Sequence, residues 1–167
     1  MNYDEKALLE KNRKKLSIKA MYFNRYLLVR YVTALFFFTN IYWLISLLMS
    51  NSSLYFIPLI LIIFLLISIA EQVKIYSSQT NNALYTKYCF TALLVANVIF
   101  ILPTYFSASF AQLYPFLVNQ DKSKIFVLTI LITGIFLSVL ILYRLYQIKN
   151  NKDNHYAHIK KYEEVIN

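Results

Sequence analysis

Both histidines of the chain, His155 and His158, lie three residues apart near the C-terminus. In a helix this spacing places the two imidazoles on one face, which is a minimal arrangement for binding a transition metal. Metal sites on helices ordinarily add a third fixed ligand and an orienting partner, and the carboxylates of Glu163 and Glu164 that follow lie one to two turns further along the tail. We therefore expect a solvated amphipathic tail and no metal or cofactor, with His155 and His158 as the only candidate ligands.

The single cysteine, Cys89, is the next side chain that could do chemistry. A catalytic cysteine needs a base and a third group that orients the base, and no histidine lies near Cys89 in the sequence. Phosphate-binding loops need several glycines, whereas Gly134 is the only one here. One cysteine also excludes an intramolecular disulfide and a four-cysteine metal site. The sequence thus predicts a protein that is not an enzyme.

The composition indicates the class of protein and the kind of secondary structure in which these side chains lie. Of the 167 residues, 59% are hydrophobic and 15% are charged, against roughly 45–50% and about 25% in soluble domains. One glycine and three prolines predict long, uninterrupted helices. These properties are typical of a helical membrane protein.

Stretches without a charged residue locate the membrane spans, because a bilayer core of about 30 Å needs roughly 20 apolar residues in a helix. A secretory signal has a shorter apolar region, and the first stretch is separated from the second only by SNSS at 50–53, so these two form an antiparallel hairpin. We predict an all-α, polytopic membrane protein, a bundle of four transmembrane helices. Its spans are expected at 31–49, 54–70, 88–106 and 125–143.

Basic residues predict the orientation, because positively charged flanks stay on the cytoplasmic side. Fifteen lysines and arginines fall on the side of the two termini and two on the other side. We therefore expect both termini in the cytoplasm. The same bias accounts for the net charge of +9, so no nucleic-acid partner is expected.

The N-terminal segment 1–30 is basic and has apolar residues at helical spacing, such as Leu9, Leu16 and Phe23. It is expected to be an amphipathic cytoplasmic helix that either lies on anionic lipid head groups or extends the first span into solvent. The C-terminal segment 144–167 is expected to be a basic cytoplasmic helical tail. The residues predicted to contact the lipid surface are Lys11, Lys14, Lys15, Lys19, Arg25 and Arg30.

Inside the four spans there is no ionisable side chain of the kind that pumps and proton-coupled carriers use. Amides in a span can hydrogen-bond between helices, and small residues four apart let helices approach closely. We expect packing within the bundle, with a homo-oligomer or partner interface as the alternative. The predicted packing residues are Asn40, Ala92, Ala96, Asn97, Gly134 and Ser138.

The segment 104–120 carries no charge but is too polar to form another span. The spacing of its apolar residues predicts a short helix in the outer interface. Its aromatic residues suit the membrane interface, where such side chains gather. The alternative is an outward-facing docking patch for another membrane protein or an apolar ligand, formed by Phe106, Phe110 and Tyr114.

Three segments carry a resemblance to a known group: FNRYLLVRYVTALFFFTNIYWLISL at 23–47, AEQVKIY at 70–76 and HYAHIKKYEE at 155–164. With these the chain resembles small uncharacterised four-span membrane proteins of low-GC Gram-positive bacteria. Members are often labelled automatically as phosphotransferase-system sugar transporter subunits. The resemblance implies a bacterial cytoplasmic membrane location and a larger partner. A true phosphoacceptor subunit of that system carries its histidine in a folded soluble domain.

We therefore expect a non-catalytic accessory or interaction subunit of a transporter or envelope complex, surrounded by the lipid bilayer. The alternatives are a small self-assembling transporter or channel, and a protein that gives immunity against a membrane-active peptide. Substitutions at Phe110 and Tyr114 would disrupt partner recovery under the first hypothesis. Substitutions at Asn40 and Asn97 would alter flux under the second.

Overall fold

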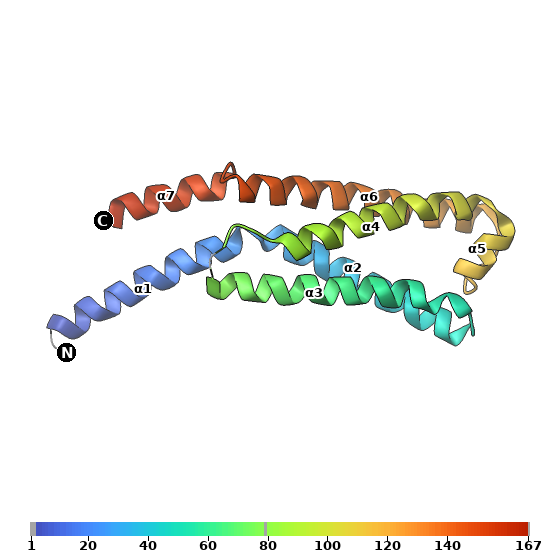
Figure 1. Cartoon of the computed structure of the whole chain (residues 1–167), viewed down its shortest axis with the longest axis horizontal. Helices are drawn as coiled ribbons and strands as arrows, with labels where there is room; N and C mark the ends of the chain where they lie inside the picture. The colour runs from blue at the N-terminus through green and yellow to red at the C-terminus, as the bar shows by residue number, and fades with distance from the viewer. Residues whose placement is uncertain (1–2, 79, 167) are drawn as a thin grey trace.

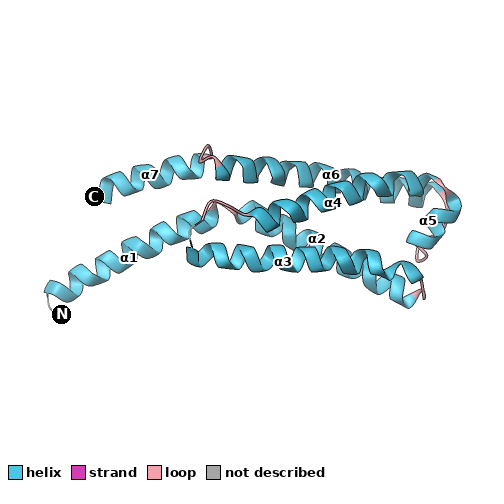
Figure 2. Ribbon diagram, viewed as in Figure 1, coloured by secondary structure: helices cyan, strands magenta, loops and turns pink. Residues whose placement is uncertain are grey.

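A computed structural model describes residues 3–78 and 80–166, and helices joined by short connections make up this part of the chain (Figures 1 and 2). No strand occurs among these residues. The helices are α1 (Tyr3–Asn24), α2 (Leu27–Met49), the 3-10 helix η1 (Ser53–Tyr55), α3 (Phe56–Ser78), α4 (Leu84–Tyr105), α5 (Ser107–Leu113), α6 (Asp121–Lys149) and α7 (Asn154–Ile166).

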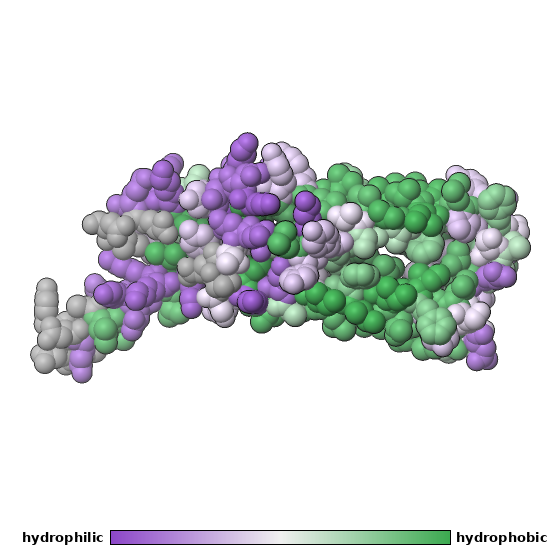
Figure 3. Space-filling view, viewed as in Figure 1, coloured by the Kyte–Doolittle hydropathy of each residue, from purple (hydrophilic) through white to green (hydrophobic). Residues whose placement is uncertain are grey.

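The four long helices α2, α3, α4 and α6 form a bundle, and each is long and apolar enough to cross a membrane. They have 23, 23, 22 and 29 residues, and roughly 20 suffice to span the hydrocarbon core. Phe38, Leu102 and Phe136 on their outer faces are 67%, 68% and 65% exposed, which suits contact with lipid chains. Apolar residues cover this part of the surface in Figure 3. The predicted all-α bundle of four spans is confirmed.

The helices extend beyond the predicted spans, mostly at the end of the bundle where α1 and α7 leave it. The α2 helix begins at Leu27 rather than at 31, α3 continues past 70 to Ser78, and α4 begins at Leu84 rather than at 88. A charge-free stretch marks the part of a helix that lies in hydrocarbon. Charged side chains beyond it do not interrupt backbone hydrogen bonding, so the helix continues.

Each long helix packs on the next one along the chain, and α4 packs most extensively on α6. The four helices would form a closed ring if α2 also packed fully on α6, but this pair meets much less extensively. The end of the bundle that carries α1, α7 and the connection 80–83 is called the polar end below, after the hydrophilic side chains that gather there in Figure 3. The opposite end, with the α2–α3 connection and α5, is called the hairpin end (Figure 1).

Two helix ends use asparagine in the left-handed conformation where glycine is common. Asn51 has φ 50° and Asn151 has φ 53°. The residue after each asparagine donates its backbone amide back to the last turn of the helix. Ser52 donates to the Leu47 carbonyl at 3.1 Å, and Lys152 donates to the Gln147 carbonyl at 3.0 Å. The only glycine of the chain is thus not needed for these turns.

The segment 104–120 contains the short helix α5, over Ser107–Leu113. Its Phe110 and Leu113 are buried in a cluster with Val127 and Leu131 of α6. The segment therefore folds back over the hairpin end of the bundle.

Candidate functional site

A cleft of about 590 Å³ lies between α2, α4 and α6, in the half of the bundle nearer the hairpin end. We call it the intramembrane cleft. Its wall is mostly apolar and includes Asn40 and Trp43 of α2, Ala96 and Asn97 of α4, and Ile130 and Gly134 of α6.

The cleft lies where the ring of helices is incomplete, between α2 and α6. Leu35 and Tyr42 of α2 and Phe126 and Ile130 of α6 line it and are all exposed on the surface of the bundle. These residues lie within helices long enough to span a membrane. In a bilayer the cleft would therefore open sideways toward lipid.

Aromatic side chains close the cleft toward the hairpin end. The indole Nε1 of Trp43 donates to the carbonyl oxygen of Leu113 at 3.0 Å. The Trp43 ring is stacked on Tyr114 at a centroid distance of 5.8 Å and meets Phe100 edge-on at 5.5 Å. Burial raises the pKa of Tyr114 to about 12. Tryptophan is well suited to this position, because its N–H finds a partner while the ring fills apolar space.

This packing corrects the prediction of an outward-facing docking patch. Phe110 is fully buried and Tyr114 is 8% exposed, whereas Phe106 is 66% exposed. The prediction was wrong for Phe110 and Tyr114 because helical spacing shows which residues share a face but not which way the face points. The apolar face of α5 lies against α6 rather than against the surroundings.

Two amides contribute polar atoms to the cleft. The Nδ2 of Asn40 donates to the Phe36 carbonyl and that of Asn97 to the Leu93 carbonyl, both at 2.8 Å within their own helices. In the described part of the chain neither side chain makes another hydrogen bond. Each Oδ1 therefore keeps its capacity to accept a hydrogen bond from a ligand.

The structure places the predicted packing residues at several levels of the bundle. Gly134 lies directly against Asn97, since a Cβ added at Gly134 would lie 2.9 Å from the Asn97 Oδ1. Ala96 lines the cleft, and Ala92 is half-buried on α4. Ser138 is fully buried in α6, and its hydroxyl has no hydrogen-bond partner among the described residues.

A chain of hydrogen-bonded polar side chains, all buried except the half-buried Glu71, lies closer to the polar end. The Nε2 of Gln72 donates to the hydroxyls of Thr33 and Ser68 at 3.0 and 3.1 Å, and the Ser68 hydroxyl donates to that of Thr86 at 3.1 Å. Thr86 in turn donates to Glu71 at 2.7 Å. These bonds link α2, α3 and α4. We call these five residues the polar tier.

Glu71 also accepts hydrogen bonds from the N-terminus of α4. Its carboxylate accepts the backbone amides of Tyr85 at 3.1 Å and Thr86 at 2.7 Å. Amides in the first turn of a helix have no partner within the helix, and a negative charge is favourable there. Glu71 therefore stabilises both the α4 N-terminus and the polar tier.

An apolar layer separates the polar tier from the intramembrane cleft. Phe36 of α2 meets Phe90 of α4 edge-on, with ring centroids 6.0 Å apart. Leu65 of α3 and Leu93 of α4 are buried in the same cluster. The layer interrupts the line of polar groups along the bundle.

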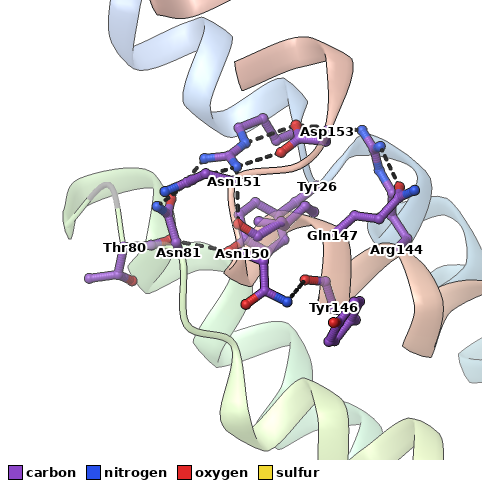
Figure 4. Close-up of polar contacts among 11 residues, drawn as sticks. Tyr26, Thr80, Asn81, Arg144, Tyr146, Gln147, Asn150, Asn151 and Asp153 are labelled. Atoms are coloured by element: carbon purple, nitrogen blue, oxygen red, sulfur yellow. Dashed lines mark hydrogen bonds and ion pairs between the residues drawn. The ribbon is translucent and has the colours of Figure 1, made fainter. Parts of the chain in front are cut away.

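At the polar end the buried guanidinium of Arg25 joins segments that are distant in sequence. Three of its partners, Asn81, Asn151 and Asp153, lie close together in Figure 4. The guanidinium donates to both carboxylate oxygens of Asp153, at 2.6 and 3.0 Å. It also donates to the Oδ1 atoms of Asn81 at 2.8 Å and Asn151 at 3.0 Å, and to the Ile148 carbonyl at 3.1 Å. We call Arg25, Asn81, Asn151 and Asp153 the arginine clasp.

The clasp corrects the prediction that Arg25 contacts lipid head groups, because Arg25 is 1% exposed and its side chain is paired with Asp153. The helix is interrupted between Asn24 and Leu27, which directs Arg25 inward. The neighbouring Tyr26 is buried as well and donates to the Thr80 carbonyl at 3.2 Å. Burial raises the pKa of Tyr26 to about 12, although the charge of Arg25 opposes the shift.

The other basic residues of the N-terminal segment differ from Arg25. The guanidinium of Arg30 lies over the Phe23 ring at 3.3 Å from its centroid and donates to the Phe23 carbonyl at 2.9 Å. The exposed or half-buried residues of α1 include Lys11, Lys14, Lys15 and Lys19. The apolar face expected on α1 packs on the bundle only near its C-terminal end, where Phe23 meets Tyr76 of α3 edge-on at 4.8 Å, whereas Leu9 and Leu16 are exposed.

His155 and His158 are exposed on α7. Among the side chains that the structure describes, which do not include that of Glu163, no three of His, Cys, Asp or Glu lie close enough to share a metal ion. Cys89 is 1% exposed. No protein-family model matches the chain, and no curated protein or solved structure matches it.

Proposed function

We propose that this is a non-catalytic membrane protein that binds a lipid-like molecule in the intramembrane cleft, and that it serves as an accessory subunit through this binding. The observation that carries the proposal is the sideways opening of the cleft between α2 and α6, at the level of two amide oxygens that accept no hydrogen bond from the described residues. Ligand sites are typically concave and mostly apolar, with a few placed polar groups.

The size of the cleft favours a slender occupant. Its volume of about 590 Å³ falls within the usual range of roughly 300–1,000 Å³ for small-molecule sites. A partner's helix with side chains measures about 10–12 Å across, so it would cover the opening rather than enter it. An apolar chain bearing a hydroxyl or N–H group fits better, because the donor can bond to the Oδ1 of Asn40 or Asn97.

The apolar layer that contains Phe36 and Phe90 favours a ligand-binding function over a channel function. A conducting pore needs a continuous hydrated path, and this layer interrupts the polar groups along the bundle.

The proposal includes the bacterial cytoplasmic membrane as the location, with the polar end and both termini in the cytoplasm. The excess of lysine and arginine on the side of the termini supports this orientation. The exposed lysines of α1 would then face anionic lipid head groups. The resemblance to small bacterial four-span proteins is consistent with this location.

Trp43 provides a direct test, because it lines the cleft and is the only tryptophan of the chain. The full-length protein would be reconstituted in phosphatidylcholine vesicles and titrated with a fatty acid brominated near the end of its chain, which quenches tryptophan fluorescence on contact. We expect saturable quenching in the wild type. Ala96→Phe should remove most of it, since the added ring occupies the cleft.

Val95→Phe is the matched control, because Val95 is adjacent in sequence but exposed on the outside of the bundle. It should leave the quenching as in the wild type. Circular dichroism and thermal unfolding would establish that both variants fold. Quenching that does not saturate, or that is equal in the two variants, would show that the probe reaches Trp43 only from bulk lipid and would overturn the proposal.

A further inference from the structure

A second hollow lies at the polar end, between the start of α4 and the end of α6, and has a volume of about 310 Å³. It is distinct from the intramembrane cleft and from the arginine clasp, although Asn81 of the clasp lines one side. The other lining residues include Lys87 of α4 and Lys149 of α6. Asn81, Asn150 and Tyr146 on its border are seen together in Figure 4.

The charge of this hollow is positive and not neutralised from within. None of the described residues that line it is acidic. In the described part of the chain Lys87 and Lys149 form no ion pair. The carboxylates of Glu71 and Asp153 are engaged elsewhere, with the first turn of α4 and with Arg25. An anion entering the hollow would therefore meet two ammonium groups.

The positive charge comes from the lysines and not from the helix end. The Tyr85 and Thr86 amides, which an anion would otherwise use, already donate to Glu71. Ammonium groups bind phosphate as point charges without demanding one geometry. The side-chain amides of Asn82 and Asn150, both exposed at the hollow, can donate further hydrogen bonds.

Apolar residues lie directly beside the lysines. Leu142 and Leu145 of α6 and Leu84 of α4 also line the hollow. The α4 and α6 helices then continue into the part of the bundle that is long and apolar enough to span a membrane. Tyr146, at the same level, is 57% exposed, as is typical of aromatic residues at a membrane interface.

We propose that the hollow between α4 and α6 at the polar end binds the phosphate of an anionic phospholipid, with Lys87 and Lys149 as the charged contacts. The leucines favour a lipid over free phosphate, because the glycerol and the first chain segments would lie against them. Basic pockets between transmembrane helices are suited to such head groups.

Native mass spectrometry of the full-length protein in detergent tests the proposal, with phosphatidylglycerol and phosphatidylcholine titrated as probes. We expect preferential binding of phosphatidylglycerol to the wild type. The double variant Lys87→Gln/Lys149→Gln should weaken that binding about tenfold or more, because each lysine near a lipid phosphate contributes appreciably.

The matched control is Lys160→Gln/Lys161→Gln, which makes the same change of charge on exposed residues of α7, outside the hollow. It should bind phosphatidylglycerol nearly as the wild type does. Equal weakening in the two double variants would show general attraction to a basic surface and overturn the site. Displacement of phosphatidylglycerol by an equal concentration of inorganic phosphate would overturn the choice of a lipid. Thermal unfolding of both variants would show that the fold is retained.

Discussion

The polar end and the cleft half of the bundle are stabilised in different ways. At the polar end, buried hydrogen bonds and an ion pair join Arg25 to Asp153, which lies 128 residues further along the chain. In the other half, aromatic packing around Trp43 covers one end of a cleft, and α2 and α6 contact each other only sparsely. Directional bonds at one end of the bundle can therefore set the positions of four helices while the other end retains space for a ligand.

The largest expected effect is on the clasp. Arg25→Ala leaves the buried carboxylate of Asp153 with only the more distant Arg144, at 4.0 Å, and the free energy of unfolding should fall by about 3–5 kcal/mol. Denaturation in mixed detergent micelles, followed by circular dichroism, measures the change. Arg13→Ala, in the exposed part of α1, is the control and should alter stability by about 0.5 kcal/mol or less.

The ion pair itself is tested by replacing both partners. The double variant Arg25→Met/Asp153→Leu should be more stable than Arg25→Ala, because no buried charge remains unpaired. If Arg25→Ala behaved like Arg13→Ala, the polar end would not be the more firmly held part and the comparison would fail.

A smaller effect is expected from Glu71→Gln. The glutamine keeps an oxygen that can accept a hydrogen bond from α4 but loses the negative charge, so the free energy of unfolding should fall by about 1–2 kcal/mol. Hydrogen exchange should also become faster at the amides of Tyr85 and Thr86.

Glu10→Gln on exposed α1 is the control for this loss of charge. Binding of the brominated fatty acid near Trp43 should be unchanged in Glu71→Gln, since the apolar layer lies between the two regions. A loss of that binding would mean that the two halves are coupled.

The smallest effect is expected at Ser138, whose buried hydroxyl has no partner among the described residues. Ser138→Ala should change the free energy of unfolding by less than about 0.5 kcal/mol or raise it slightly. Thr33→Val is the contrasting variant, because Gln72 donates to the Thr33 hydroxyl. It should lower stability by about 1 kcal/mol. The reverse order would show that the hydroxyl of Ser138 has a partner in the membrane.

Sequence reasoning located the four spans because a charge-free run is a local property of the chain. It failed for Arg25 because positive charge near a span usually indicates contact with the lipid surface. The only opposing signal was Asp153, an acidic residue next to an asparagine-rich turn, and nothing local links it to Arg25. Phe110 and Tyr114 were placed on the wrong side for a similar reason, since their burial depends on Trp43 and α6.

The amino-acid sequence alone predicts the number of helices long and apolar enough to cross a membrane, their approximate positions and their lipid-facing composition. These depend on the transfer free energy of successive side chains and on backbone hydrogen bonding within each helix. The arginine clasp, the polar tier and the two hollows form only when the helices pack together. Each arises from which helices are neighbours and at what height their side chains meet, and those contacts join residues far apart in the chain.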